Sequence, residues 1–155
     1  MNKIIYRKAI EKDIDIIVKL NSELDNSQRA PFRKIKKNSE PIVKKFFLSA
    51  IKSKKQISFV AENKKEIIGF IIVSIRSAPQ IFENKLEAVI TDLFVKKEFR
   101  KIGVAKTLIK KAKQFAKKQN CPYVRLNVYY SNKLAQKVYD KIGFKKFAII
   151  YAGAI

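Results

Sequence analysis

The residues best suited to chemistry form a short basic turn, residues 100–103, between two apolar segments. Residues 88–95 have the apolar character of a buried strand, and the apolar residues after Gly103 recur at the spacing of an amphipathic helix. The turn therefore precedes a helix N-terminus, where backbone N–H groups lack partners and the helix dipole favours negative charge. Arg100, Lys101 and Lys106 add positive charge, so the pattern predicts a pyrophosphate site.

The glycine pattern of this turn excludes two common phosphate-binding motifs. No Gly-Lys-Ser/Thr follows as it would in a P-loop, and the three glycines and distant acidic residue of a dinucleotide fingerprint are missing. Taken alone, such a turn can equally be ordinary packing with surface lysines.

A second informative segment covers residues 123–144. Residues 123–129 are strand-like, and the residues after them predict a short helix that Asn132 caps, Gly143 ends and Tyr139 occupies near its C-terminus.

The two segments together resemble the GNAT family of N-acetyltransferases, and most nearly its polyamine and diamine acetyltransferase subgroup. In that family a strand, an Arg/Gln-x-x-Gly-x-Gly/Ala turn and a helix hold the diphosphate of acetyl-coenzyme A. An Asn-x-x-Ala-x-x-x-Tyr-x-x-x-Gly-Phe segment follows one strand later, and it is complete here from Asn132 to Phe144. The resemblance covers residues 88–144 and implies a GNAT fold and an N-acetyltransferase that uses acetyl-coenzyme A.

The resemblance also implies which residues bind this cosubstrate. They are Leu93, Phe94, Val95, Arg100, Lys101, Ile102, Gly103, Val104, Ala105, Lys106 and Asn132. The backbone of residues 93–95 would pair with the pantetheine arm as an added strand. An N–H of Leu93 or Phe94 would meet the developing oxyanion, provided the strand departs from regular pairing there.

Acyl transfer to an amine needs a base and an acid. An alkylamine with a pKa of about 10.4 must lose a proton before it attacks a thioester, and the leaving thiolate gains one. By the resemblance Tyr139 is the acid, the alternative being a core tyrosine. Thr91 stands where the subgroup often carries glutamate and cannot be the base, so Asp92 is our candidate. The alternatives are a structural role for Asp92 and proton loss through bulk solvent or through water held by Thr91 and Glu87.

The predicted acceptor pocket is acidic and suits a cationic amine. Its members would be Asp92, Glu87, Glu83 and either Glu23 or Asp25, with Thr91 beside them. A polyamine, an amino acid, an antibiotic and a protein's terminal or lysine amine all remain open as acceptors. A plain surface role is favoured for Glu23 and Asp25, which lie where the first helix ends.

The remaining segments predict one domain over residues 1–155. In chain order we expect a strand at 4–10, a helix at 12–24, a loop at 26–38, a helix capped by Ser39, a hairpin of 56–61 and 67–75 with a bulge at Gly69, the strand–turn–helix described above, the strand and helix of 123–144, and a closing strand at 147–151. The fold class is therefore α/β, with a mixed, largely antiparallel sheet and helices on both faces.

Composition narrows the setting. Cys121 is the single cysteine, there is no histidine, and no basic-then-apolar leader opens the chain, so we expect a cytoplasmic protein without metal or membrane span. The net charge of +22 suggests a nucleic acid, a membrane surface or an acidic partner. We favour a solvated lysine face instead, because no nucleic-acid motif accompanies the charge.

Three functions stay open on the sequence. The leading one is amine N-acetylation; the others are a non-catalytic acyl-coenzyme A-binding regulatory module and, with least support, a nucleic-acid-binding domain. The apolar tail, residues 147–155, could give an edge strand to a homodimer partner or finish its own sheet.

Overall fold

A computed structural model describes residues 3–27 and 36–153. Its elements are β1 (Ile5–Lys8), η1 (Glu11–Asp13), α1 (Ile14–Ser27), α2 (Glu40–Lys52), β2 (Gln56–Asn63), β3 (Glu66–Ser77), β4 (Leu86–Val95), η2 (Lys97–Phe99), α3 (Val104–Lys118), β5 (Val124–Leu126) and α4 (Lys133–Lys141). The expected order of elements is confirmed as far as α4. No helix in the described residues is long and apolar enough to cross a membrane.

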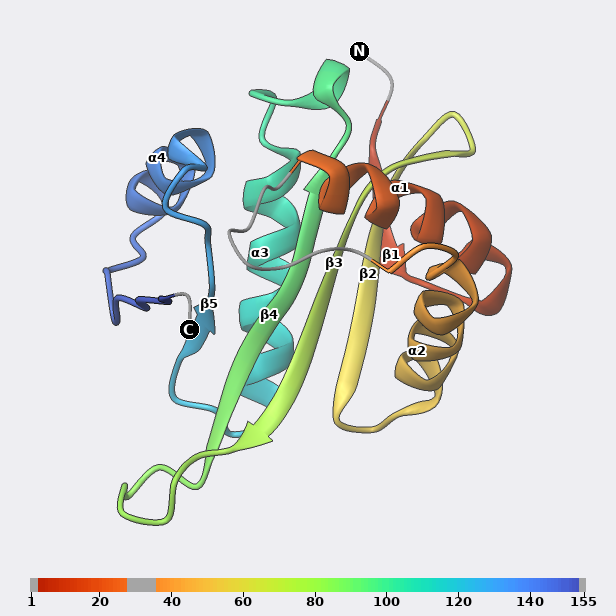
Figure 1. Cartoon of the computed structure of the whole chain (residues 1–155). Helices are drawn as coiled ribbons and strands as arrows, with labels where there is room; N and C mark the ends of the chain where they lie inside the picture. Colours follow the sequence, from red (N-terminus) through yellow and green to blue (C-terminus); the bar gives the residue numbers. More distant parts are fainter. Residues whose placement is uncertain (1–2, 28–35, 154–155) are drawn as a thin grey trace.

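The sheet contains five strands in chain order, with four antiparallel strands and β5 parallel to β4. One buried cluster joins the sheet to α1 and α2, and a second joins its other face to α3 and the end of α4. Figure 1 shows α1 and α2 on one face and α3 behind the other. The expectation of a mixed, largely antiparallel sheet with helices on both faces is confirmed.

The first helix is fastened to the sheet edge by an ion-pair network. The Arg7 guanidinium contacts both carboxylate oxygens of the buried Asp13, at 2.6 and 2.9 Å, and also bonds Glu62 on β2. Asp13 accepts a further bond from the Ile10 N–H at 2.9 Å. This network fixes where α1 begins.

The hairpin of β2 and β3 turns at Lys64 and Lys65, whose positive φ values of 49° and 67° suit a tight two-residue connection. The pairing shifts by one residue beside Gly69, as predicted. Gly69 also meets a steric limit, because a Cβ there would lie 2.7 Å from the Phe94 carbonyl oxygen.

A β-bulge interrupts β4 at Thr91. Ile72 faces Asp92 and Val73 faces Ile90, so Thr91 has no partner on β3. The bulge reverses the alternation of side chains along the strand. Ile90, before the bulge, and Leu93, after it, therefore both pack in the buried cluster on the α3 side of the sheet, which we call the α3 cluster.

One local prediction is wrong, and a second is right only in position. Residues 147–151 form no strand, and Phe147 and Tyr151 are largely exposed. An apolar run needs a neighbouring strand to satisfy its backbone, and β5 pairs only with β4 in the described residues. Ser39 is the N-cap of α2, as predicted, but its side chain makes no capping bond; its backbone carbonyl accepts from the N–H groups of Ile42 and Val43 instead. The predicted loop at residues 26–38 lies largely outside the described residues.

Candidate active site

The C-terminal half of β4 has an open edge. β5 pairs with β4 only at residues 88–90, and no described strand continues along residues 91–95 on that side. In Figure 1 the chain leaves β5 for α4 while β4 runs on toward the start of α3. β4 and β5 therefore separate after residue 90, and the edge of residues 91–95 is left without a described strand partner.

Only some of the backbone groups of residues 93–95 face this open edge. The Lys96 N–H donates to Ile68 on β3 at 2.9 Å. Because alternate residues of a strand direct their N–H and C=O groups to opposite sides, those of Leu93 and Val95 point to the open edge. Phe94 pairs with Phe70, so its N–H faces β3. Of the two amides named for the oxyanion, the Leu93 N–H is the accessible one.

The basic turn lies immediately beyond the end of β4. Gly103 is the N-cap of α3 with φ 91°, Lys101 is also left-handed with φ 67°, and no side chain caps the helix. The N–H groups of the first helical turn have no partner inside a helix. Lys101 and Lys106 are exposed and belong to none of the ion pairs in the described residues. Residues 101–106 therefore present backbone donors and positive charge, with exposed Ile102 among them.

Arg100 ties this turn to the strand. Its Nε donates to the Val95 carbonyl oxygen at 2.9 Å, and its guanidinium carbon lies 5.9 Å from the centre of the Phe94 ring. The side chain thus lies back over β4, and the Val95 carbonyl on the open edge already has a partner. The sequence predicted that Arg100 binds the cosubstrate. The structure shows its hydrogen bond to β4, which the sequence did not predict.

The start of α4 is as predicted. The Asn132 side-chain oxygen accepts from the Ala135 N–H at 3.1 Å, and Gly143, with φ 86°, ends the helix. Because the Asn132 side-chain oxygen caps the helix, the NH₂ of the Asn132 amide is the group left to bind a ligand.

Tyr139 is partly buried against the α3 cluster, with its ring 5.9 Å from that of Phe144. Burial raises the pKa of the Tyr139 phenol above its ordinary value, so the hydroxyl stays protonated at neutral pH. No hydrogen bond among the described residues involves this hydroxyl. The hydroxyl of a buried tyrosine normally has a hydrogen-bond partner. The Tyr139 hydroxyl has none among the described residues, so its proton is available for donation to a ligand.

The predicted carboxylates do not form one pocket. Glu87 lies five residues before Asp92, about 15 Å along the strand. Glu83 lies further back, beside a cavity that Cys121 and Lys117 also line at the far end of α3. An acidic pocket that combines Glu83, Glu87 and Asp92 is therefore wrong, because residues spread along a strand cannot converge.

Glu87 is also neutralised within the chain. Arg125 donates to its two carboxylate oxygens at 2.9 and 2.6 Å, and the Tyr123 hydroxyl donates at 3.0 Å. The hydrogen bond from Arg125 holds the pKa of the buried Glu87 carboxyl below its usual range. Sequence reasoning missed this cluster. The signal was the spacing of Tyr123 and Arg125, which puts them on one face of β5.

Asp92 and Glu23 remain near the open end of β4. Asp92 is partly buried and shares a strand face with Phe94, which packs toward α1 and α2. The bond to Glu66 raises the pKa of Lys96, and the negative charges of Glu98 and, last, Glu23 on α1 add to this effect, so Glu23 is within electrostatic range of the residue that follows β4. The Thr91 hydroxyl is buried without a hydrogen-bond partner. The side chain of Asp25 lies outside the described part.

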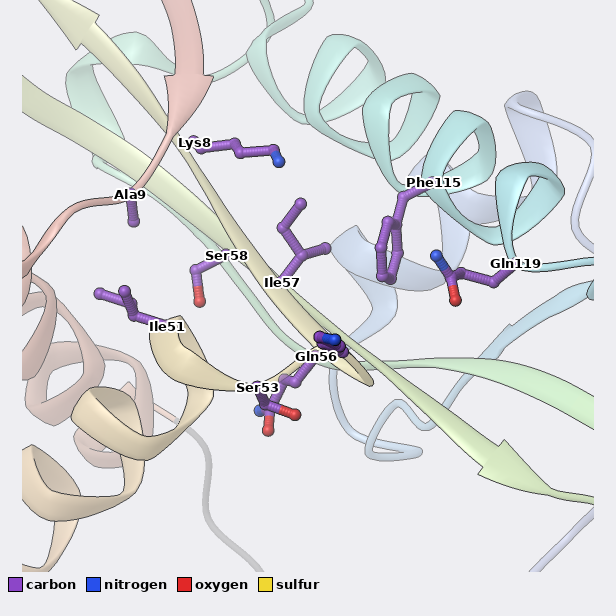
Figure 2. Close-up of a pocket in the computed structure, with 10 residues that line it drawn as sticks. Lys8, Ala9, Ile51, Ser53, Gln56, Ile57, Ser58, Phe115 and Gln119 are labelled. Atoms are coloured by element: carbon purple, nitrogen blue, oxygen red, sulfur yellow. The ribbon is translucent and has the colours of Figure 1, made fainter.

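An open cavity of about 450 Å³ lies elsewhere, at the opposite end of the sheet. Figure 2 shows it between β2, the end of α2 and the end of α3, with Ser58, Ile57 and Phe115 among the lining side chains. None of the predicted site residues lines it. The described residues also contain no group of three His, Cys, Asp or Glu side chains that could hold a metal ion.

Comparison with known proteins places this geometry among acetyltransferases. The profile described as the acetyltransferase (GNAT) family matches residues 21–144. N-acetyltransferase 8 from Homo sapiens is 32% identical over 57% of this chain and 38% of its own length. An N-alpha-acetyltransferase from Sulfurisphaera tokodaii is 26% identical over 93% of this chain and 81% of its own.

A solved structure has the same fold. The aminoglycoside N-acetyltransferase AAC(6')-Iy, in complex with CoA, superposes with a TM-score of 0.81 at 20% identity, covering 100% of this chain and 97% of that one. The first curated relatives are longer: the chain spans 38% of the human protein and 40% of an uncharacterized N-acetyltransferase from Methanocaldococcus jannaschii.

Proposed function

The chain belongs to the acetyltransferase (GNAT) family, and from this premise we propose that it transfers an acetyl group from acetyl-coenzyme A to a primary amine, by direct attack in a ternary complex. The observation that carries the proposal is the continuity of the open β4 edge with the uncapped, basic N-terminus of α3. An extended thiol arm ending in a diphosphate has this shape and charge requirement.

The residues present fit this cosubstrate. A Cβ at Gly103 would meet nothing within 4 Å, so the space beside the turn is open to a phosphate. The N–H groups of residues 101–106 would bind the diphosphate, and the Leu93 backbone on the open edge would bind the arm. When bound, acetyl-coenzyme A supplies a thioester carbonyl to the amine.

Two side chains would manage the protons. The Tyr139 hydroxyl is protonated at neutral pH and bonded to no described residue, so it would donate its proton to the departing sulfur. Asp92 on the bulged strand would accept the amine proton, directly or through water near the Thr91 hydroxyl.

The acceptor would enter from the α1 side of β4. Asp92 faces that side, and Glu23 supplies negative charge close to the end of the strand. Two carboxylates on this side would attract a cationic amine. The relatives named for peptide N-termini and for aminoglycosides make both worth testing, and the polyamine subgroup stays a prediction.

Thiol release from acetyl-coenzyme A across a panel of amines tests the proposal. The panel should contain spermidine, an aminoglycoside, a free amino acid and a peptide with a free N-terminus. Release above the rate without amine supports the enzyme. Cosubstrate binding without release for any amine would instead favour the non-catalytic acyl-coenzyme A-binding module.

A further inference from the structure

The lysines of residues 99–155 form no ion pair in the described part of the chain. Residues 99–155 carry 14 of the 35 basic residues but only one of the 13 acidic residues, Asp140. The ion pairs in the described part of the chain use Arg7, Lys44, Lys52, Lys96 and Arg125, and none uses a lysine of α3 or α4. This charge is therefore available to an external partner.

The lysines of α3 form a stripe along its outward face. Lys106, Lys110, Lys113 and Lys117 recur every three or four residues and are exposed. The opposite face of the helix, with Leu108, Ile109 and Ala112, is buried in the core. The stripe extends about 16 Å from the turn at Lys106 to Lys117, at 1.5 Å per residue.

A second group of lysines adjoins this stripe. The ammonium of Lys113 lies 4.8 Å from the centre of the Phe144 ring, so the end of α4 lies beside the middle of α3. In Figure 1 α4 and the chain after it lie on the β5 side of the molecule. We define the lysine surface as the exposed residues around this contact. They are Lys110, Lys113, Lys117, Lys141, Lys145 and Lys146.

The chemistry of this surface selects its partner. A helix that lies in a membrane interface inserts its apolar face, but the apolar face of α3 is already buried in the core. Protein–protein interfaces are depleted in lysine at their centre, whereas the nucleic-acid backbone is bound mainly by Lys and Arg without reading of bases. We propose that the lysine surface binds the phosphodiester backbone of a nucleic acid without sequence preference.

The structure adds the location of this charge, because it places the lysines of α3 and of the chain after α4 on one surface. On the sequence a solvated face is favoured, because no nucleic-acid motif accompanies the charge. The lysine surface excludes Lys106 and the turn at residues 100–103, so a partner bound there leaves the cosubstrate site open. Asp140, next to Lys141, is the one acidic residue between residues 99 and 155.

Fluorescence anisotropy with a labelled 20-base-pair DNA duplex, and with an RNA duplex of the same sequence, tests the proposal across a series of salt concentrations. One variant replaces Lys113, Lys117, Lys141 and Lys145 with Gln. The control replaces Lys19, Lys37, Lys45 and Lys64 with Gln; these are exposed, outside all ion pairs of the described residues, and remove the same charge.

Each phosphate contact contributes about 0.9 to the slope of log affinity against log salt for duplex DNA. We expect the first variant to lower that slope by about 3 and the control by less than 1, with equal melting temperatures in circular dichroism. Binding of either duplex supports the proposal, and a preference between DNA and RNA identifies the source of the backbone.

Three results would overturn the proposal. The first is absence of binding by the parent protein at 50 mM salt, and the second is an equal loss in both variants, which would reduce the effect to net charge. The third is complete displacement of the duplex by saturating acetyl-coenzyme A, which would move the contact to the turn. None of these readouts depends on acetyl transfer.

Discussion

The Arg100 side chain donates from Nε to the Val95 carbonyl oxygen at 2.9 Å and so joins the basic turn to the open edge of β4. The same side chain lies over Phe94 on the neighbouring position of the strand. The two parts of the candidate cosubstrate site, strand edge and helix N-terminus, are thereby held in one arrangement. Loss of the Arg100 side chain should therefore disturb both parts of the site.

Replacement of Arg100 with Gln should weaken acetyl-coenzyme A binding about tenfold. The change removes one positive charge from the turn and the bond that holds the turn to β4. A loss of about 1.4 kcal/mol in binding free energy corresponds to a factor of ten. Isothermal titration calorimetry measures the affinity. Lys12→Gln removes the same charge from the exposed surface far from the turn and should leave it unchanged; equal losses would show that only net charge matters.

Replacement of Gly103 with Ala should destabilise the turn without a steric clash. The left-handed φ of 91° costs a residue with a Cβ about 1–2 kcal/mol, while no atom lies within 4 Å of that Cβ. Urea unfolding should show this loss together with weaker cosubstrate binding. Gly153→Ala, at a glycine with equally open space and no positive φ, serves as the control. A Gly103→Ala protein as stable as that control would refute the argument.

Replacement of Gly69 with Ala should destabilise the end of β4 by about 1–3 kcal/mol. The added Cβ would lie 2.7 Å from the Phe94 carbonyl oxygen, and that oxygen belongs to backbone that cannot rotate away. Urea unfolding measures the loss, and hydrogen exchange should locate it at the amides of residues 93–95. Unchanged exchange there would contradict the predicted contact.

The Arg7–Asp13 pair should make stability depend on pH. Burial alone would raise the pKa of the Asp13 carboxyl, but the bonds from Arg7 and the Ile10 N–H outweigh it and hold that pKa below its ordinary value. A lowered pKa in the folded state stabilises the protein above the unfolded pKa of about 3.9, and the effect is lost as pH falls through the folded pKa.

Replacement of Asp13 with Asn should therefore cost about 3 kcal/mol at pH 7, because it leaves Arg7 with a weaker partner in a mostly buried site. The difference from the parent should shrink as pH falls below about 4. Asp15→Asn, at an exposed ion pair with Lys44, should cost less than about 1 kcal/mol. Urea unfolding at pH 7 and pH 3 provides the check, and a pH-independent difference would contradict the assignment.

Local chemistry made much of the site predictable. The positive φ of Gly103, the cap by Asn132 and the stop at Gly143 each follow from one residue type at one place. The bulge at Thr91 could not be predicted in the same way, because it depends on how β3 and β4 pair over their whole length. The burial of Glu87 under Arg125 likewise requires the parallel pairing of β4 and β5.

The sequence predicts residues 147–151 as a strand that the structure does not contain. Residues 147–151 have the composition of a strand, yet a strand exists only where a neighbour pairs with it, and none of the described strands does. The apolar composition of these residues indicates a tendency to form a strand. Whether a neighbouring strand is present to pair with them depends on how the whole sheet is assembled. Whether a second copy pairs with this tail stays a prediction.

The turnover of the Tyr139→Phe variant tests the central claim most directly. With the amine that gives the fastest thiol release, we predict a rate 10²–10⁴ times lower than that of the parent, the range for loss of a general acid, with acetyl-coenzyme A affinity within about threefold. A variant that binds the cosubstrate equally and releases thiol as fast as the parent would contradict the account.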